Sequence, residues 1–292
     1  MTDALKITSL SVKGSNAWNE DAWINNEATR LYGVIDGATS LVPFVGRKGE
    51  TGGVLAARII EGYLNRVDLN IVTQSQDLLQ LLVEANDQLR LEMKRNGIGL
   101  EQKAELWSAC AVLARVNEHW IDYAHAGDCM LIAYYKDETI RVVTHDQLEH
   151  IDQLTLDRWA EGVAAGIVRR DDLWAHTMPQ IVKGRNLANA PGGYAVLNGD
   201  PELVNYAEYG RISRVGIKAL LLVSDGLYAP KAANTPRIEG AVELAIRVRE
   251  MGLKPYVDWL IELEESDSEC VQFPRVKKSD DKTALYIELG ED

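Results

Sequence analysis

The chain contains four short strand-like runs in close succession, joined by links of only two to four residues. The runs cover residues 109–116, 119–125, 130–135 and 139–143. The turn-like links contain Asn117-Glu118, Gly127-Asp128 and Lys136-Asp137-Glu138. Links this short require antiparallel neighbours, because a crossover to a parallel strand needs a dozen or more residues. The pattern therefore argues against a doubly wound parallel sheet.

Helical patterns lie on both sides of these strands. We expect helices at residues 52–67, from about Ser75 to Met93, and at 147–166, 236–251 and 255–265. Further strands are expected at 5–12, 31–35, 220–223 and 284–289. This order favours antiparallel sheets that carry helices on their outer faces. Residues 169–214 are the least periodic part, and we interpret them as an irregular excursion within a single domain that spans residues 1–292.

The composition narrows the class of protein and its partners. The 292 residues are 46% hydrophobic, which is enough for a large core. A net charge of −13 argues against binding to nucleic acid or to an anionic membrane. There is neither a membrane-spanning apolar run nor a signal segment at Met1, so the sequence predicts a cytoplasmic protein. Three cysteines without a CxxC pair are typical of reduced thiols and argue against a zinc site.

An aspartate followed by glycine comes directly after an apolar strand at two distant places, Asp36-Gly37 and Asp225-Gly226. A strand that ends in a carboxylate holds a hard oxygen ligand at a sheet edge. The glycine would let the backbone turn sharply there and approach whatever the carboxylate binds. Either copy alone is also consistent with a plain turn, since Asp-Gly is a common turn dipeptide. Two such strands side by side would form a site for divalent cations.

Three further carboxylate positions lie where a predicted strand meets a turn: Glu20-Asp21, Asp128 and Asp280-Asp281. Adjacent acids such as Asp280-Asp281 are also typical of a solvated loop. Acids from far-apart strand ends can nevertheless converge on one sheet edge, and carboxylate oxygens are the ligands that Mg²⁺ and Mn²⁺ prefer. The acidic positions together therefore indicate a cation site.

The acidic motifs also occur in a recognisable order. They are Asn19-Glu20-Asp21-Ala22, Val34-Ile35-Asp36-Gly37, Ala126-Gly127-Asp128, Val223-Ser224-Asp225-Gly226-Leu227 and Ser279-Asp280-Asp281-Lys282-Thr283. This ordered set resembles the metal-dependent (type 2C, PPM-type) serine/threonine protein phosphatases, in a bacterial-like form, from about Ile7 to Leu289. The resemblance implies an α+β fold, a four-layer α-β-β-α sandwich of two antiparallel sheets flanked by helices. It also implies that the excursion around 169–214 contributes a flap near the site.

The resemblance implies roles for the acidic positions as well. The implied metal ligands are Glu20, Asp21, Asp36, Gly37, Asp128, Asp225 and Asp280. Asp36 would bridge two Mn²⁺ or Mg²⁺ ions, with the Gly37 carbonyl and, through water, Glu20 or Asp21 on one ion. Asp225 and Asp280 would hold the other ion, and Asp128 matches the acid that helps to hold a third ion in some members. Asp36 and Asp225 are thus the expected catalytic residues, acting through a metal-activated water without a covalent intermediate.

Three positions depart from the pattern of that family. Asn16 stands where the family usually has a phosphate-clamping arginine, and it lacks the charged fork of a guanidinium. Asn16 itself, Lys13 and Arg185 are therefore our candidates to bind the substrate phosphate, although both cations are also consistent with ordinary surface charge. Ala38 stands where many eukaryotic members have a general-acid histidine. Cys129-Met130 replaces the usual serine and arginine.

Three functions remain open at this point. The first is a phosphatase that acts on phosphoserine and phosphothreonine in proteins and opposes a serine/threonine kinase in signalling. The second is a catalytically weak or inactive regulator that uses the same fold to bind a partner. The third is a phosphatase of a small phosphorylated metabolite. None of them predicts contact with nucleic acid or a membrane, and fold resemblance alone does not fix a reaction.

Overall fold

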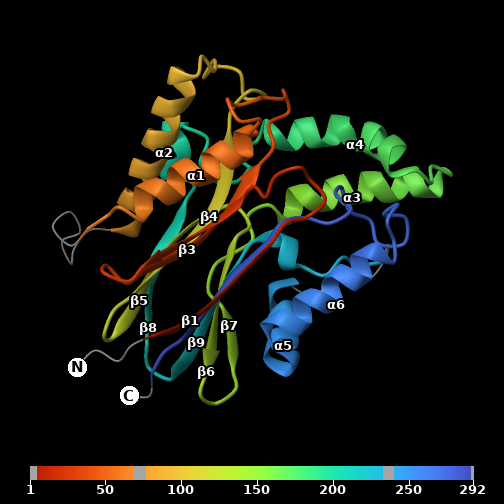
Figure 1. Ribbon diagram of the computed structural model, residues 1–292. Coiled ribbons are helices and arrows are strands. Elements are labelled where there is room, and N and C mark those ends of the chain that lie inside the picture. The colour runs from red at the N-terminus through yellow and green to blue at the C-terminus, as the bar shows by residue number, and fades with distance from the viewer. Residues whose placement is uncertain (1–4, 69–76, 233–239, 291–292) are drawn as a thin grey trace.

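Two five-stranded antiparallel sheets face each other in the computed structural model, which describes residues 5–68, 77–232 and 240–290 (Figure 1). Sheet A has the order β1 (Lys6–Val12), β10 (Lys282–Glu288), β9 (Ile217–Val223), β6 (Met130–Tyr135), β7 (Ile140–Val142). Sheet B has the order β2 (Asp21–Asn26), β3 (Leu31–Ala38), β4 (Ser108–Val116), β5 (Trp120–Ala126), β8 (Glu208–Ser213).

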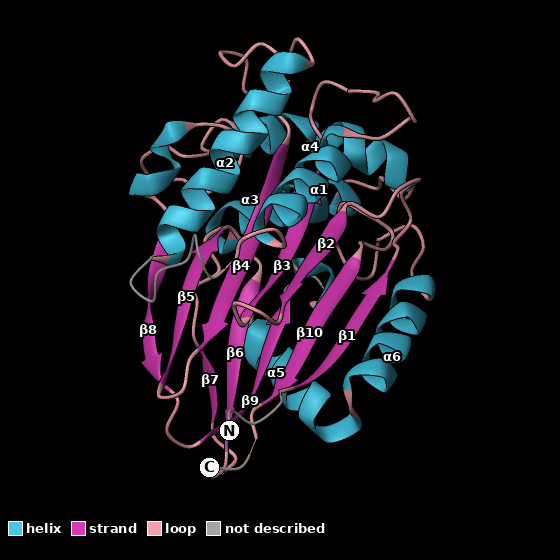
Figure 2. Ribbon diagram, turned by 60° about the vertical axis from the view of Figure 1, so that its left-hand side comes forward, coloured by secondary structure: helices cyan, strands magenta, loops and turns pink. Residues whose placement is uncertain are grey.

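Helices cover the outer faces of both sheets, so the sandwich has four layers (Figure 2). Helices α1 (Gly52–Leu64) and α2 (Leu78–Arg95) pack on sheet B through an apolar layer that includes Ile60, Leu82 and Leu113. Helices α5 (Gly240–Met251) and α6 (Leu253–Glu265) pack on sheet A. A third apolar layer between the sheets includes Val34, Val112, Leu131, Leu222 and Leu285. The expected four-layer α+β architecture is confirmed.

Strand β4 illustrates why the central strands carry long apolar runs. All nine of its residues are buried, because its two faces lie against the helical layer and the inter-sheet layer. Edge strand β1 alternates between exposed and half-buried positions instead. Of the predicted helix starts, Ser75 and Pro236 lie outside the described residues. Among the helices that are described, none is long and apolar enough to cross a membrane.

One expectation about the short links is wrong. Strands β4 and β5 pair, and so do β6 and β7, but β5 belongs to sheet B and β6 to sheet A. The Gly127-Asp128 link therefore crosses from one sheet to the other. Gly127 has φ +97°, and a Cβ there would lie 2.2 Å from the Cys110 sulfur, so the tight crossing requires glycine. As a result, Asp128 lies between the ends of the two sheets.

The segment 169–214 is also more regular than its sequence suggests. It contains helix α4 (Arg170–Arg185), the short 3₁₀ helix η1 (Pro201–Asn205) and strand β8. Helix α4 packs beside α3 (Glu149–Ala164) at one end of the sandwich (Figure 1). Only Leu173, Thr177 and Gly184 of α4 are buried. A helix that buries so few side chains needs no apolar stripe of helical period, and its sequence therefore did not indicate a helix. Strand β2, which precedes β3, was not expected either.

Candidate metal centre

The two Asp-Gly pairs lie in different sheets and approach each other across the sandwich. Asp36 lies inside β3 of sheet B, whereas Asp225 follows β9 of sheet A and begins the 3₁₀ helix η2 (Asp225–Leu227). The strands thus face each other rather than lying side by side as expected. Gly37 continues strand β3 without the expected turn, whereas the backbone turns at Gly226 into η2, and neither glycine has a positive φ. A Cβ at Gly37 would lie 2.3 Å from the Gly53 carbonyl oxygen, and one at Gly226 would lie 1.8 Å from that of Asp281, so both glycines permit close backbone packing.

Five aspartates converge at this end of the sandwich, and we call them the acidic cluster: Asp21, Asp36, Asp128, Asp225 and Asp280. Asp21 begins β2 and is the pairing partner of Asp36 on β3. Asp280 lies two residues before Lys282, where β10 begins, and Asp128 lies in the link between the sheets. A cleft of about 1600 Å³ opens over them and is lined by Asp36, Asp128, Asp225 and Asp280. Both sheets therefore contribute carboxylates to one cleft.

Burial and mutual repulsion disfavour the charged form of these carboxyl groups. Burial, opposed by a hydrogen bond from Ser224 and reinforced by the Asp280 charge, raises the pKa of Asp21 to about 8. Burial and the charges of its neighbours raise the pKa of Asp36 well above its ordinary value. The pKa values of Asp128 and Asp225 are raised for the same two reasons. A low-dielectric site thus holds several groups that cannot all be charged without compensation.

The acidic cluster also contains carboxylate oxygens that lack hydrogen-bond partners. The Oδ1 atoms of Asp21, Asp128 and Asp225 are buried, and no described residue donates to them. The charge of Asp225 is among those that raise the pKa of Asp36, so the two carboxyl groups influence each other. Hard, unpartnered oxygens fit Mg²⁺ or Mn²⁺. Within the described ranges no three such side chains already have ligand spacing, so ion binding would require the carboxyl groups to rotate.

The side chain of Glu20 points away from the acidic cluster. Its carboxylate accepts hydrogen bonds from the hydroxyl groups of Thr39 and Thr51, near the start of α1. Asp21, in contrast, accepts a 2.8 Å hydrogen bond from Ser224 Oγ and experiences the charge of Asp280. Of the two neighbouring acids, Asp21 is therefore the one that faces the acidic cluster.

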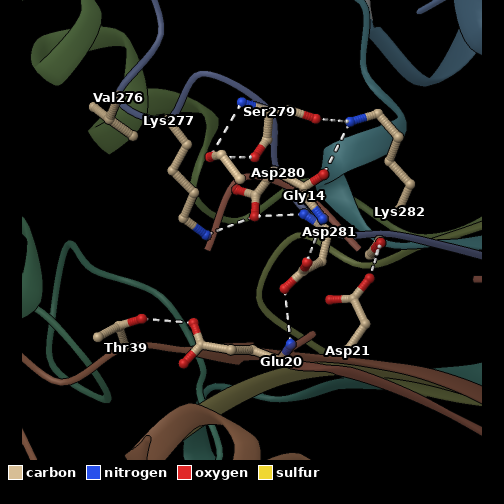
Figure 3. Close-up of polar contacts among 12 residues, drawn as sticks. Gly14, Glu20, Asp21, Thr39, Val276, Lys277, Ser279, Asp280, Asp281 and Lys282 are labelled. Atoms are coloured by element: carbon tan, nitrogen blue, oxygen red, sulfur yellow. Dashed lines mark hydrogen bonds and ion pairs between the residues drawn. The ribbon is translucent and has the colours of Figure 1, made fainter. Parts of the chain in front are cut away.

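Asp281 has a structural role that the sequence did not reveal. It is 3% exposed, and its two oxygens accept hydrogen bonds of 2.7 Å from the backbone N–H groups of Gly14 and Glu20 (Figure 3). These bonds join the start of β10 to the segment between β1 and β2, and so fix Asp21 relative to Asp280. The alternative that Asp280-Asp281 forms a solvated loop is therefore wrong for Asp281.

The three candidates for phosphate binding differ in position. Asn16 and Arg185 line the cleft. Arg185 donates to Ser108 Oγ at 3.1 Å and to the Thr39 carbonyl oxygen at 3.5 Å. Lys13 does not line the cleft, and its ammonium group donates instead to the Asn16 carbonyl oxygen at 2.7 Å. The structure thus groups two of the three with the acidic cluster.

Comparison with known proteins agrees with this fold. A sequence profile of the family described as Protein phosphatase 2C matches residues 11–263. Serine/threonine phosphatase Stp1 from Staphylococcus aureus is 17% identical over 100% of this chain and 97% of its own, with a TM-score of 0.60. Serine/threonine phosphatase PstP/Ppp from Mycobacterium tuberculosis is 20% identical over 98% and 99%, with a TM-score of 0.57.

A structure of the PstP catalytic domain in complex with two manganese ions is 18% identical, with a TM-score of 0.56 and coverage of 98% of this chain and 99% of its own. No curated protein sequence matches the chain. At these identities the solved structures establish the fold alone, whereas the profile match spans most of the sequence. The chain belongs to the protein phosphatase 2C family.

Proposed function

We propose that the protein is a metal-dependent phosphatase that hydrolyses phosphoserine and phosphothreonine in proteins. The observation that carries this proposal is the set of buried carboxylate oxygens without partners, which both sheets bring to one cleft. Burying uncompensated charge lowers the stability of a fold. Such a set is expected where bound cations complete the charge balance of the working protein.

The arrangement of the acidic cluster suggests how two ions would be shared. Asp36 comes from sheet B, and the charges of Asp21 and of Asp225, which follows β9 of sheet A, both raise its pKa, which suits Asp36 as the bridging ligand. Asp225 and Asp280 would hold one ion, with Asp21 and the Gly37 carbonyl on the side of the other. Asp128 would serve a third. The manganese complex of PstP supports this assignment by fold similarity.

When bound, two Mn²⁺ or Mg²⁺ ions would supply a water nucleophile near neutral pH and positive charge against the phosphoryl oxygens. The chain itself would fix Asp36 and Asp225 within a rigid sandwich, because their backbones pack closely through Gly37 and Gly226. No nucleophilic side chain is needed, so a covalent intermediate is not part of the proposal.

The size of the cleft favours a polypeptide over a small metabolite. Its volume of about 1600 Å³ exceeds the roughly 300–1000 Å³ of typical small-molecule sites. One wall comes from α3 and α4 and carries the apolar side chains of Ile151, Leu156, Trp174 and Met178. The proposed partners are therefore a phosphoprotein substrate and the serine/threonine kinase that phosphorylates it, and a cytoplasmic location stays a prediction.

Hydrolysis of p-nitrophenyl phosphate in the presence of Mn²⁺ tests the proposal. We expect turnover that a chelator abolishes and that added Mn²⁺ or Mg²⁺ restores. Turnover on phosphopeptides should then exceed turnover on a panel of phosphorylated metabolites. If the folded protein binds Mn²⁺ but shows no metal-dependent turnover, the proposal is wrong and the regulator is the better description.

A further inference from the structure

Among the described cations that line the cleft, Lys277 alone forms an ion pair with the acidic cluster. Its Nζ atom lies 2.6 Å from Asp280 Oδ1 (Figure 3). Arg275 instead donates to Asp267 and to several carbonyl oxygens of its own loop. Arg185 donates to Ser108 and Thr39 at another part of the cleft. Of the described cations that line the cleft, Lys277 is therefore the one whose ammonium group directly contacts a proposed metal ligand.

The backbone around Lys277 is held in place on both sides. Arg275 Nε donates to the Lys278 carbonyl oxygen at 3.0 Å, and Arg170 Nη1 donates to that of Val276 at 3.4 Å. The Val276 side chain also packs against a buried cluster that contains Trp159. Because this loop is anchored, the direction in which the Lys277 side chain extends is a property of the fold.

Lys282, five residues further along at the start of β10, provides a comparison, because all of its hydrogen-bond donors have acceptors within the protein. It is completely buried, and its three donors are used by Glu264 Oε1, Ser279 Oγ and the Asp280 carbonyl oxygen at 3.0, 3.0 and 2.9 Å. The Lys277 side chain is 28% exposed and donates to Asp280, and no other described residue accepts a hydrogen bond from it. An ammonium group has three donors, so two remain for a ligand in the cleft.

Lys277 brings positive charge into direct contact with the acidic cluster and lines the same cleft. A phosphate dianion that enters a cleft lined by aspartates needs positive charge beyond that of the two ions. Asn16, whose neighbour Ser15 hydrogen-bonds to Ser279 of the same loop, contributes none.

We propose that Lys277 is a substrate-binding residue whose ammonium group donates hydrogen bonds to a phosphoryl oxygen while it stays paired with Asp280. This inference rests on the proposed function for its substrate, but it concerns a phosphate-binding contact that can be measured without turnover. Lys277 was not among the residues that the sequence suggested for phosphate binding, which were Lys13, Asn16 and Arg185. The proposal gives Lys277 a role in binding and none in proton transfer.

Binding of inorganic phosphate to the Mg²⁺-loaded protein, measured by isothermal titration calorimetry, tests this role. We expect Lys277→Met to weaken phosphate binding roughly 10- to 100-fold, as loss of a charge-assisted hydrogen bond does. Lys277→Arg should recover most of that loss. Lys278→Met is the matched control, because Lys278 is the next residue and pairs with Glu265 outside the cleft, and it should bind phosphate like the wild type.

The alternative is that Lys277 only balances the charge of the acidic cluster. In that case Lys277→Met would bind Mg²⁺ more tightly and leave phosphate affinity unchanged, and this result would overturn the proposal. Failure of the wild-type protein to bind phosphate would overturn it too. If phosphate binding depends on Lys277 but the wild type hydrolyses no phosphoester, the inference stands and the proposed function falls.

Discussion

Each of the two ends of sheet B holds an aspartate, but the surroundings of the two carboxyl groups differ in how far they compensate the charge. At one end, Asp122 on β5 is paired across the strands with Arg115 on β4. Its oxygens contact Arg211 Nε at 2.6 Å, Asn117 Nδ2 at 3.0 Å and Arg115 Nη2 at 3.4 Å. At the other end, Asp36 on β3 lies among four more aspartates, and its pKa is raised.

The difference separates a carboxylate whose charge the protein compensates from a cluster whose charge it leaves largely uncompensated. Asp122 is complete within the protein, because arginine and asparagine side chains satisfy its oxygens. The acidic cluster has Lys277 as a directly bonded cation and still retains buried oxygens without partners. Burial alone therefore does not indicate a functional acid, and we expect function where buried carboxylate oxygens also lack partners.

The largest effect that should distinguish the two ends is on turnover. We expect Asp36→Asn to lower kcat roughly 1000-fold, since it removes the proposed shared ligand and several kcal/mol of transition-state stabilisation. The same change relieves repulsion, so the melting temperature of the metal-free variant should equal or exceed that of the wild type. Steady-state kinetics with Mn²⁺ and thermal unfolding in chelator provide the two readouts. Full metal-dependent turnover in Asp36→Asn would refute the two-ion assignment.

The second-largest expected effect is on how the stability of the metal-free protein depends on pH. The unfolded chain releases the Asp21 proton near the ordinary pKa of 3.8, whereas the folded protein keeps it until about pH 8. Stability is then fully present below pH 3.8 and is lost as pH rises towards 8. We expect the melting temperature in chelator to fall by at least about 5 °C between pH 5.5 and pH 8.5.

Asp21→Asn is the control for that titration, and it should reduce the slope of the melting temperature against pH. Saturating Mn²⁺ should make the melting temperature of the wild type nearly independent of pH over the same range. Asp122→Asn should leave the slope unchanged, because its partners lie at the far end of the sheet. A metal-free stability that is constant or rises over this range would contradict the assignment of uncompensated charge to the acidic cluster.

The smallest effect is expected at the end of sheet B where arginine side chains compensate the charge of Asp122. Asp122→Asn removes the charge that Arg115 and Arg211 face, and it should lower the free energy of unfolding by about 2 kcal/mol. Denaturant unfolding measures this loss. The kcat of the folded variant should equal that of the wild type, so a selective loss of kcat would break the contrast between the two ends.

Much of the fold could be read from local patterns. Apolar runs such as residues 31–35 and 130–135 became strands, and the spacing of Leu78, Leu82 and Leu89 became α2. Links of a few residues indicated antiparallel pairing, which holds for β4–β5 and β6–β7. What local patterns could not show was that the Gly127-Asp128 link changes sheets, because that depends on packing against Cys110.

The candidate site was predicted in part for similar reasons. Asp36 and Asp225 follow recognisable strands, so their convergence could be proposed, and in the described structure both line the same cleft. Glu20 could not be separated from Asp21, since the hydroxyl groups of Thr39 and Thr51 that hold it come from distant positions. Lys277 was missed, although a lysine three residues before Asp280 is a local signal that could have indicated it.

Direct titration of the metal-free protein with Mn²⁺ tests the central claim that the acidic cluster is a cation site. Isothermal titration calorimetry should show two Mn²⁺ ions bound per wild-type chain, weaker or fewer ions for Asp36→Asn, and unchanged binding for Asp122→Asn. Wild-type protein that binds no Mn²⁺, or Asp36→Asn protein that binds it as the wild type does, would contradict the account.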